Sequence, residues 1–451
     1  MRFANGGSDW STWETYAATK SWQLATGDGN KIVYVQFKDF ADNISETYTD
    51  SVVLDTTAPT GSVSINSGAQ YSSSATVTLT CTASDAGSGV TDMRFANVGS
   101  AWNDWESYAS SKSWILATGN GTKAVYVQYR DAIGRISATY SDSIVVDVTA
   151  PNTPGTPTDS GAFSTNTSLT FNWTAGSDTG SGVSGYNCQV GTTPNGNDVF
   201  DSSVGTALSK TISGSYGGHY FCRVQTQDKA GNISTWSNSS DGISVVEQAV
   251  PDIGSAKHAT GSRSVGLASK AVTAVLGDHF YIEEPSRTSG LMVIPVAGIS
   301  TGLVVGSLVD IGGVLNLTSD DELYLDATVQ VIAGHLTIHP LGFSNLALGG
   351  GDWYYTASPP VGQRGITGGH GPNNIGLLAR TWGTVTPVDS GSFEISDGSG
   401  AKITVVVPLG VAVPSAGKYV GVTGISSCHK VGSELRRMLL VRGSGDISLY
   451  Q

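Results

Sequence analysis

The sequence predicts an all-β protein built as a string of small modules. Apolar and polar residues alternate in short runs, and turns of Gly, Asn, Asp and Ser separate these runs. Gly is abundant, at 58 of 451 residues, and only 14% of residues are charged, as expected where neutral side chains on strands and turns form the surface. A block of the chain is also repeated. We therefore expect tandem β-sandwiches followed by two small β-barrels, since a single core does not grow to this length.

The repeat has a period of 92 residues. Residues 1–59 align without a gap with residues 93–151, and about 37 of the 59 positions are identical. Both copies end in Thr-Ala-Pro, and Pro59, Pro151 and Pro251 mark successive joints. The complete copy, residues 59–150, predicts an antiparallel sandwich. Its strands are expected near residues 61–66, 75–83, 91–97, 113–117, 123–130 and 139–147.

The first copy, residues 1–58, starts at the position that matches Met93 and lacks the counterparts of the first two strands. A sandwich without these strands would expose a sheet edge and half of its core. Two interpretations remain open. Met1 is an internal methionine of a longer chain whose signal peptide is lost with the missing part, or a neighbouring molecule supplies the strands.

Residues 1–150 resemble the tandem immunoglobulin-like repeats of large bacterial surface and secreted proteins. The resemblance rests on the turn SDAGSGV at 84–90, the turn DAIG at 131–134 and the joint VVDVTAP. Residues 151–249 resemble a fibronectin type III module, with Trp173 in LTFNWTA, Tyr186 in GVSGYNCQV and Tyr220 in GHYFCRVQTQDKAGNIS. Members of that family place a tyrosine of this kind at the corner before a central strand.

Four cysteines in so long a chain are not a disulfide scaffold, and none has a metal-binding spacing. Cys188 and Cys222 share the parity of Tyr186 and Tyr220, so both are expected to point inward on strands that pair in such modules. Two outcomes stay open: a cross-strand disulfide, or two small apolar side chains that fill core space.

The C-terminal half resembles two OB-fold barrels, residues 250–347 and 375–451. The segment FYIEEPSRTSGLMVIP corresponds to FEISDGSGAKITVVVP, and VVGSLVDIGGVL corresponds to SAGKYVGVTGIS. A Gly/Pro-rich connection, residues 348–374, joins the two barrels, and connections of this length are usually functional or linkers. The resemblance implies a face that binds oligonucleotides or oligosaccharides.

Aromatic residues are the candidate ligand contacts. The spacing Trp-x-x-Trp-x-x-Tyr does not match one face of a strand, so an aromatic of each set should point away from the core and stack on Arg2, Arg94 or a sugar ring. The alternative is an aromatic–arginine ladder that braces the sandwich. The candidates are Trp10, Trp13, Trp102, Trp105, Trp353, Tyr354 and Tyr355. In the barrels we add Phe280, Tyr281 and Trp382, with Arg436, Arg437 and Arg442 as phosphate contacts; packing inside the barrels and a solvated basic face are the favoured alternative.

Asp85, Asp131 and Asp228 lie in turns where oxygen ligands could gather around Ca²⁺. Aspartate also favours turns because of local hydrogen bonds, and this second explanation is the favoured one. No nucleophile with a base, paired carboxylate site or other metal motif has a specific pattern. We therefore expect a protein that is not an enzyme and has no cofactor apart from this Ca²⁺ candidate.

The net charge of −13 disfavours nucleic acid as a partner, with residues 375–451 as the exception. No apolar stretch approaches the roughly 20 residues of a membrane span, so membrane insertion is not expected. We expect a non-catalytic extracellular or cell-surface bacterial protein for adhesion, display or carbohydrate binding, with a carbohydrate, another surface polymer or a protein as partner. Two alternatives remain: the accessory C-terminal region of a secreted hydrolase whose catalytic domain lies upstream, and barrels that bind single-stranded nucleic acid.

Overall fold

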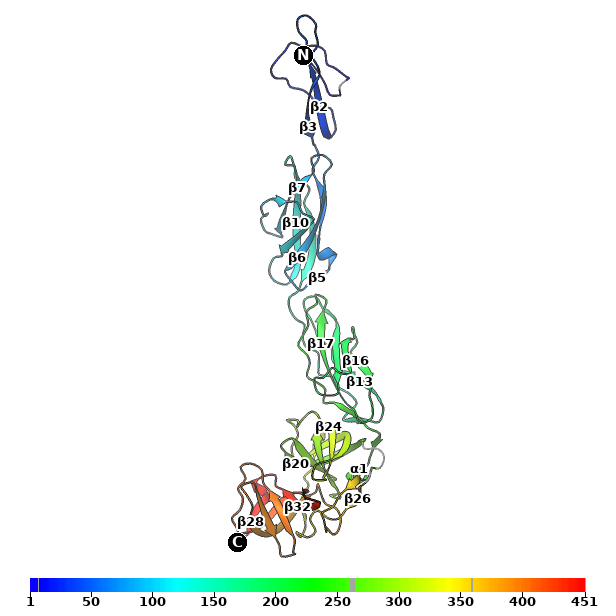
Figure 1. The fold of residues 1–451 in the computed structure, drawn as a ribbon, viewed down its shortest axis with the longest axis vertical. Helices are drawn as coiled ribbons and strands as arrows, with labels where there is room; N and C mark the ends of the chain where they lie inside the picture. Colours follow the sequence, from blue (N-terminus) through cyan, green and yellow to red (C-terminus); the bar gives the residue numbers. More distant parts are fainter. Residues whose placement is uncertain (7, 260–263, 358–359, 451) are drawn as a thin grey trace. The chain divides into compact units, whose positions relative to one another are not determined.

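The computed structural model describes all residues except 7, 260–263, 358–359 and 451 (Figure 1). Strands form 48% of the chain and helices 3%, which confirms the predicted all-β class. Among the described residues, no helix is long and apolar enough to cross a bilayer. Contacts divide the chain into two units: residues 1–151 with 178–183 and 227–233, and the remainder.

The complete repeat is a sandwich of two sheets. One sheet has the order β5-β11-β10-β7-β8, and the other has the order β4-β6-β9. The strands are β4 (Thr60–Ile65), β5 (Tyr71–Ser72), β6 (Thr76–Ser84), β7 (Val90–Asn97), β8 (Glu106–Ser107), β9 (Ser111–Ile115), β10 (Gly121–Asp131) and β11 (Tyr140–Val146). The six longer strands each lie within two residues of their predicted bounds.

The period-2 pattern of β10 explains the core of this sandwich. Val125, Val127 and Tyr129 are fully buried, while the residues between them face the flank and are only partly covered. The Tyr129 hydroxyl donates a hydrogen bond to the backbone oxygen of Ser62 at 2.6 Å. Because Ser62 lies on β4, this bond joins the two sheets and satisfies the polar end of a buried aromatic ring.

The first copy forms a single three-stranded sheet of β1 (Arg2–Ala4), β2 (Gly29–Gln36) and β3 (Tyr48–Leu54). Its apolar face is poorly covered: Val52 is 52% exposed, whereas the equivalent Ile144 of the complete copy is 2% exposed. Residues 19–23, which correspond to β9, form no strand. In the complete copy β9 pairs with β6, and the first copy contains no counterpart of β6.

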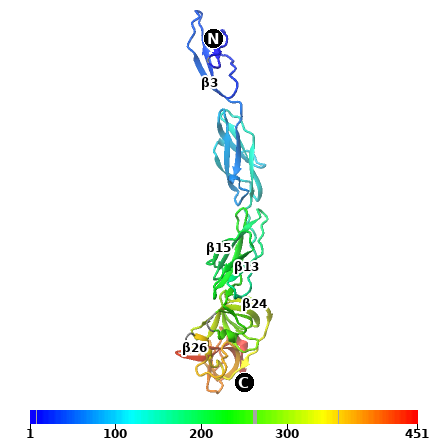
Figure 2. The same cartoon turned by 90° about the vertical axis from the view of Figure 1, so that its right-hand side faces the viewer.

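The third module also has two sheets, with orders β12-β18-β17-β14-β15 and β13-β16 (Figure 2). Trp173 is buried with its ring edge-on to Tyr186, and the Tyr220 hydroxyl accepts the N–H of Ser215 at 2.8 Å. Tyr220 therefore holds the turn before its strand, as the resemblance implied. The strands are β12 (Phe163–Ser164), β13 (Ser168–Asn172), β14 (Val183–Gly191), β15 (Phe200–Ser203), β16 (Ser209–Ser213), β17 (His219–Asp228) and β18 (Ile243–Val245).

Cys188 on β14 and Cys222 on the neighbouring β17 both point into this core and are fully buried. Their sulfur atoms lie 3.6 Å apart, and both are free thiols. The structure thus brings the two residues together as two buried thiols that fill core space. Their joining by a disulfide stays a prediction.

The C-terminal half contains two closed five-stranded barrels. The first has the order β20-β21-β22-β24-β23 and closes through a β20–β23 pairing; the second has the order β28-β29-β30-β32-β31 and closes through β28–β31. In each barrel the third and fifth strands along the chain are parallel neighbours: β22 with β24 in the first barrel, and β30 with β32 in the second. The same order and the same parallel pair make the second barrel a structural repeat of the first.

The elements of this half include short additions to the barrels. Helix α1 (Ile253–Lys257) precedes the first barrel, and a hairpin of β26 (Trp353–Ala357) and β27 (Pro360–Gln363) lies in the predicted Gly/Pro-rich connection. The remaining strands are β19 (Gln248–Ala249), β20 (Ser264–Leu276), β21 (His279–Glu283), β22 (Gly290–Pro295), β23 (Ser307–Leu317), β24 (Leu323–His335), β25 (Leu341–Gly342), β28 (Leu378–Pro387), β29 (Ser392–Ser396), β30 (Lys402–Val406), β31 (Tyr419–Val431), β32 (Glu434–Leu440) and β33 (Ile447–Tyr450).

The two barrels pack against each other through a mixed apolar and polar interface. Tyr281 and Met292 of the first barrel share a buried cluster with Leu378 and Ile425 of the second. Around it, the carboxylate of Glu283 accepts the N–H of Leu378, and the carboxylate of Glu322 accepts the hydroxyl of Ser427. Burial raises the pKa of Glu283 and of Glu322 to about 7 in each case.

These two carboxyl groups predict that the barrel interface weakens as pH rises. The pKa of each carboxyl group is higher in the folded state than its ordinary value of 4.5, so between these two values the folded state binds more protons than the unfolded state. The stability that these protons add is fully present below about pH 4.5 and is lost as the pH rises through about 7. We expect hydrogen-exchange protection of β21 and β24, corrected for the intrinsic rate, to fall between about pH 4.5 and pH 7 and to level off above that. The double variant Glu283→Gln, Glu322→Gln should flatten this dependence. The matched control is Glu394→Gln, whose partly exposed carboxylate pairs with Lys402. An equal pH dependence in the double variant and the wild type would contradict the assignment.

Candidate functional site at the module joints

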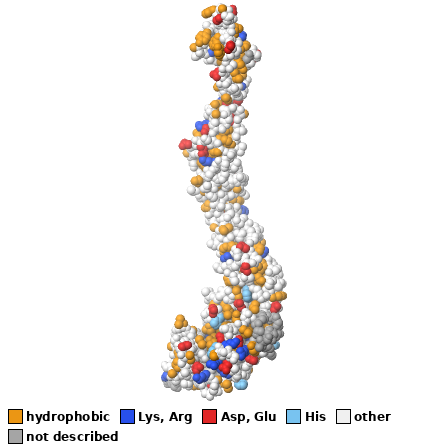
Figure 3. Space-filling view, viewed as in Figure 1, with side chains coloured by type: hydrophobic (Ala, Val, Ile, Leu, Met, Phe, Trp, Pro, Cys, Tyr) orange, Lys and Arg blue, Asp and Glu red, His pale blue; other side chains and the backbone are white. Residues whose placement is uncertain are grey.

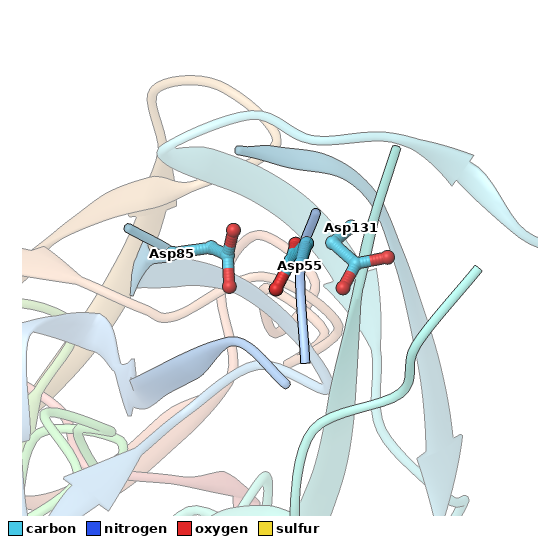
Figure 4. Close-up of side chains that lie close together, drawn as sticks. All are labelled: Asp55, Asp85 and Asp131. Atoms are coloured by element: carbon cyan, nitrogen blue, oxygen red, sulfur yellow. The ribbon is translucent and has the colours of Figure 1, made fainter. Parts of the chain in front are cut away.

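Three carboxylates meet where the first module joins the complete repeat. Asp55 follows β3, Asp85 lies in the turn after β6, and Asp131 ends β10. One carboxylate oxygen of each residue lies within 4.8 Å of the other two. Figure 4 shows the side chain of Asp55 between those of Asp85 and Asp131. We call this set the first joint cluster.

The turn SDAGSGV organises two of these acids. The Asp85 Oδ1 atom accepts the N–H groups of Gly87, Ser88 and Gly89 at 3.1, 2.9 and 2.9 Å. The Asp55 Oδ2 atom accepts the N–H of the same Ser88 at 2.9 Å and also its hydroxyl. Ser88 therefore links the carboxylate of one module to the turn of the next.

The third acid, Asp131, is satisfied on one side only. Its Oδ1 atom accepts the N–H groups of Ile133 and Arg135 at 3.1 and 2.7 Å. Its Oδ2 atom is buried and has no hydrogen-bond partner, although the residue is only 2% exposed. The Arg135 Nε donates to the backbone oxygen of Asp55 at 2.9 Å. One positive charge thus lies beside three negative ones.

The same arrangement recurs as a second joint cluster of Asp147, Asp178 and Asp228, again within 4.8 Å of one another. Asp147 stands 92 residues after Asp55, Asp178 lies in SDTGSGV, and Asp228 opens DKAGNIS as Asp131 opens DAIGRIS. Ser181 donates its N–H to Asp147 at 2.6 Å. In the place of Arg135 stands Asn232, whose Nδ2 donates at 2.7 Å both to the backbone oxygen of Asp147 and to Asp228.

The central acid of each cluster is held in its ionised form. A hydrogen bond from the Ser88 hydroxyl lowers the pKa of Asp55 from its ordinary value. Burial acts to raise the pKa of Asp147, but hydrogen bonds from Ser181 and Thr149 outweigh burial and lower the pKa. Both carboxylates are therefore charged at neutral pH.

The sequence-predicted acids are found in two separate clusters. The structure brings Asp85 and Asp131 together, while Asp228 belongs to the second cluster. Sequence reasoning missed Asp55, Asp147 and Asp178. Two signals could have found them: the motif Asp-x-Thr-Ala-Pro ends both copies of the repeat, and SDTGSGV differs from SDAGSGV at one position.

Each cluster requires a glycine in its turn. A Cβ atom added to Gly87 would collide with the Asp55 carboxylate, and one added to Gly180 would collide with that of Asp147. Both neighbours are buried side chains held by several hydrogen bonds, so neither can move without breaking these bonds.

We expect Gly87→Ala to destabilise the first joint by about 1–3 kcal/mol, because the methyl group overpacks a filled site. The measurement is hydrogen exchange of the amides of the turn 85–89 and of the adjoining strands. Gly6→Ala is the control, since nothing lies within 4 Å of a Cβ at Gly6 and the second copy carries Val98 there. Equal protection in both variants would show that the turn tolerates a side chain.

The tryptophan sets of the two copies stack on arginine. In the complete copy, the Arg94 guanidinium lies 5.0 Å from the ring centre of Trp102 and 4.5 Å from that of Trp105, and Arg130 lies 4.6 Å from Trp105. Arg94 also donates twice to the Gln128 side-chain oxygen, at 3.0 and 2.6 Å. These contacts form an aromatic–arginine ladder on the flank of the sandwich.

The first copy builds the same ladder. Arg2 lies 4.8 Å from the ring centre of Trp10 and 4.6 Å from that of Trp13, and it donates to Gln36. All four indoles of the two ladders are partly exposed. Since guanidinium groups already contact these rings, a sugar would share them with the ladder. Binding by these residues stays a prediction.

We expect Arg94→Met to lower the stability of the complete repeat by about 1–2 kcal/mol, through loss of two cation–π contacts and the bonds to Gln128. Thermal unfolding followed by tryptophan fluorescence would measure the change. Arg436→Met is the control, since Arg436 pairs only loosely, at 3.6 Å, with the exposed Glu434. If Arg94→Met were as mild as this control, the ladder would have no bracing role.

The barrel aromatics fall into two groups. Phe280 and Tyr281 are fully buried, so neither forms a binding platform, and Phe280 packs inside its barrel as the favoured alternative held. Trp353 is partly buried and its Nε1 donates to the backbone oxygen of Gly254 at 3.4 Å. Tyr355 is partly buried on the same strand, and the side chain of Tyr354 lies outside the described residues.

Trp382 on β28 is partly exposed. Two of the three barrel arginines are engaged by the protein itself. Arg437 donates to the backbone oxygens of Leu346 and Leu348, and Arg442 forms an ion pair with Asp446 at 2.7 Å. Arg436 is the most exposed of the three arginines.

No protein-family profile matches the chain. Chitinase A1 from Niallia circulans is 31% identical over 235 residues, which cover 48% of this chain and 30% of that protein. The chain therefore spans about a third of the length of this relative.

Among solved structures, the fibronectin(III)-like modules of Clostridium thermocellum CbhA match 41% of this chain and 94% of theirs, with 16% identity and a TM-score of 0.30. The FN1–FN3 domains of chicken CNTN1 match 54% of this chain and 88% of theirs, with 13% identity and a TM-score of 0.26.

Proposed function

We propose that this chain is a non-catalytic, extracellular region of a carbohydrate-active protein, and that it spaces and presents binding surfaces. The observation that carries the proposal is the 31% identity to Chitinase A1 over 235 residues. The aligned part is under a third of that enzyme, which agrees with an accessory region rather than a shared catalytic domain. The fold class agrees as well, because β-sandwich strings serve many binding and spacing roles.

The module joints support the spacing role. In the first joint, Asp55 of one module accepts hydrogen bonds from Ser88 of the next, and Arg135 returns a bond to the backbone of Asp55. Several bonds across a short connection restrict its motion more than a flexible Gly/Ser linker would. The surface suits an extracellular polymer environment: on the face shown in Figure 3, charged side chains are sparse over most of the sandwich modules.

Carbohydrate contacts, in this proposal, come from partly exposed aromatic rings. Trp10, Trp13, Trp102 and Trp105 form one set, repeated at equivalent positions of two modules, and Trp353 with Tyr355 forms another. A set repeated along the chain gives several weak contacts to one polymer, and linked weak contacts add avidity. The strand order of the two barrels supports an oligosaccharide-binding OB-like fold as a further contact region.

The full chain is expected to bind an insoluble polysaccharide and to release no reducing sugar from it. A pull-down with chitin, cellulose and xylan would measure the bound fraction, and a reducing-end assay would measure hydrolysis. We expect the double variant Trp102→Ala, Trp105→Ala to bind several-fold more weakly, because it removes one of the repeated contacts. The control is Trp173→Phe, a conservative change at a buried ring.

Three outcomes would contradict the proposal. Absence of binding to every polysaccharide would remove the carbohydrate role, and hydrolysis by the isolated chain would show that it is catalytic. Binding of a single-stranded oligonucleotide in place of polysaccharide would move the function to the barrels.

A further inference from the structure

We propose that the first joint cluster, Asp55, Asp85 and Asp131, and the second joint cluster, Asp147, Asp178 and Asp228, each bind one Ca²⁺ ion. The inference goes beyond the accessory role, because it concerns how the modules are joined and not what they contact. It rests on four features of the clusters: the oxygen spacing, an unsatisfied buried oxygen, the excess of negative charge, and the recurrence of the whole arrangement.

The spacing of the oxygens suits calcium. Calcium binds six to eight oxygen ligands at about 2.3–2.6 Å, so two oxygens on one ion can be at most about 5 Å apart. In each cluster the three candidate oxygens lie within 4.8 Å of one another.

An unsatisfied buried oxygen lies in the first cluster. Asp131 is 2% exposed, and its Oδ2 atom has no hydrogen-bond donor. A buried carboxylate oxygen without a partner is costly, because burial removes the water that would otherwise solvate it. The neighbouring guanidinium of Arg135 does not bond to this oxygen; its Nε donates to the backbone oxygen of Asp55. A cation held by the three carboxylates would provide the missing partner.

Each cluster also carries an excess of negative charge. Like charges a few ångströms apart repel strongly in a partly buried site, and hydrogen bonds from N–H groups reduce this repulsion without cancelling it. In the first cluster Arg135 contributes one positive charge, whereas the uncharged Asn232 takes its place in the second. We therefore infer that the second site binds calcium more tightly than the first.

The same set of residues forms both joint clusters. The acid of Asp-x-Thr-Ala-Pro, the turn acid, the acid that ends the long strand, and a glycine beneath the first acid occur in both clusters. In the first cluster the acids come from both sides of the joint, since Asp55 follows one module and Asp85 and Asp131 belong to the next. A bound ion would therefore tie one module to its neighbour.

Isothermal titration of the full chain with CaCl₂, after dialysis against EDTA, tests the proposal. The expected result is two bound ions per chain, falling to one in Asp131→Asn and to one in Asp228→Asn, and to none in the double variant. The matched control is Asp39→Asn. The Asp39 Oδ1 atom accepts the N–H groups of Ala41 and Asn43, as that of Asp131 accepts those of Ile133 and Arg135, but Asp39 belongs to neither cluster.

Arg135→Asn is a second variant that tests the charge argument by giving the first site the residue of the second. It is expected to tighten calcium binding at the first site several-fold, with the stoichiometry unchanged. Circular dichroism in EDTA checks that each variant is folded, and Asp85→Asn replaces Asp131→Asn if that variant fails to fold. No heat with CaCl₂ in the wild type, equal affinity for MgCl₂, or a loss of sites in Asp39→Asn would each overturn the proposal.

Discussion

The joint between modules depends on one buried carboxylate that accepts hydrogen bonds from the following module. Asp55 comes just after the last strand of the first copy, and Ser88 of the next module donates to it. Asp85 holds the turn that carries Ser88 by accepting its N–H groups, and Gly87 leaves room for the carboxylate of Asp55. Asp147, Ser181 and Gly180 repeat the arrangement. Together with the bonds from Arg135 to the backbone of Asp55 and from Asn232 to the backbone of Asp147, this contact adds to the covalent connection between successive modules.

The sequence predicted the strands well because their signal is local. Alternation along residues 123–130 gave β10 to within two residues, and the same held for the other long strands of the complete repeat. The inward orientation of Cys188 and Cys222 was also expected, because parity within a strand decides which side chains face the core. The barrel closures, β20–β23 and β28–β31, join strands far apart in the chain, so they were implied only by the resemblance to OB-fold barrels and by no local pattern.

The candidate site was predicted only in part, for a reason that is geometric. The sequence indicated three acids as Ca²⁺ candidates because each lies in a Gly-containing turn: Asp85, Asp131 and Asp228. Asp55 and Asp147 lie in the motif Asp-x-Thr-Ala-Pro, which ends both copies of the repeat, but the motif does not show that a turn of the next module folds over them. The partition of the three predicted acids between two clusters also follows from tertiary contacts alone, because the sequence does not show which of these turns fold together.

The glycine beneath the joint acid has a consequence for how such chains evolve. Everything the joint needs is contained in short motifs at the two ends of a module: an acid before Thr-Ala-Pro at one end, and the turns that receive it at the other. The third module differs from the second in most of its sequence, yet it carries the same receiving turns. The coupling is thus independent of the body of the module. A duplicated, inserted or exchanged module that keeps these end motifs would dock onto its neighbours without any change to its core. The number and the identity of the modules can therefore change independently of the joints.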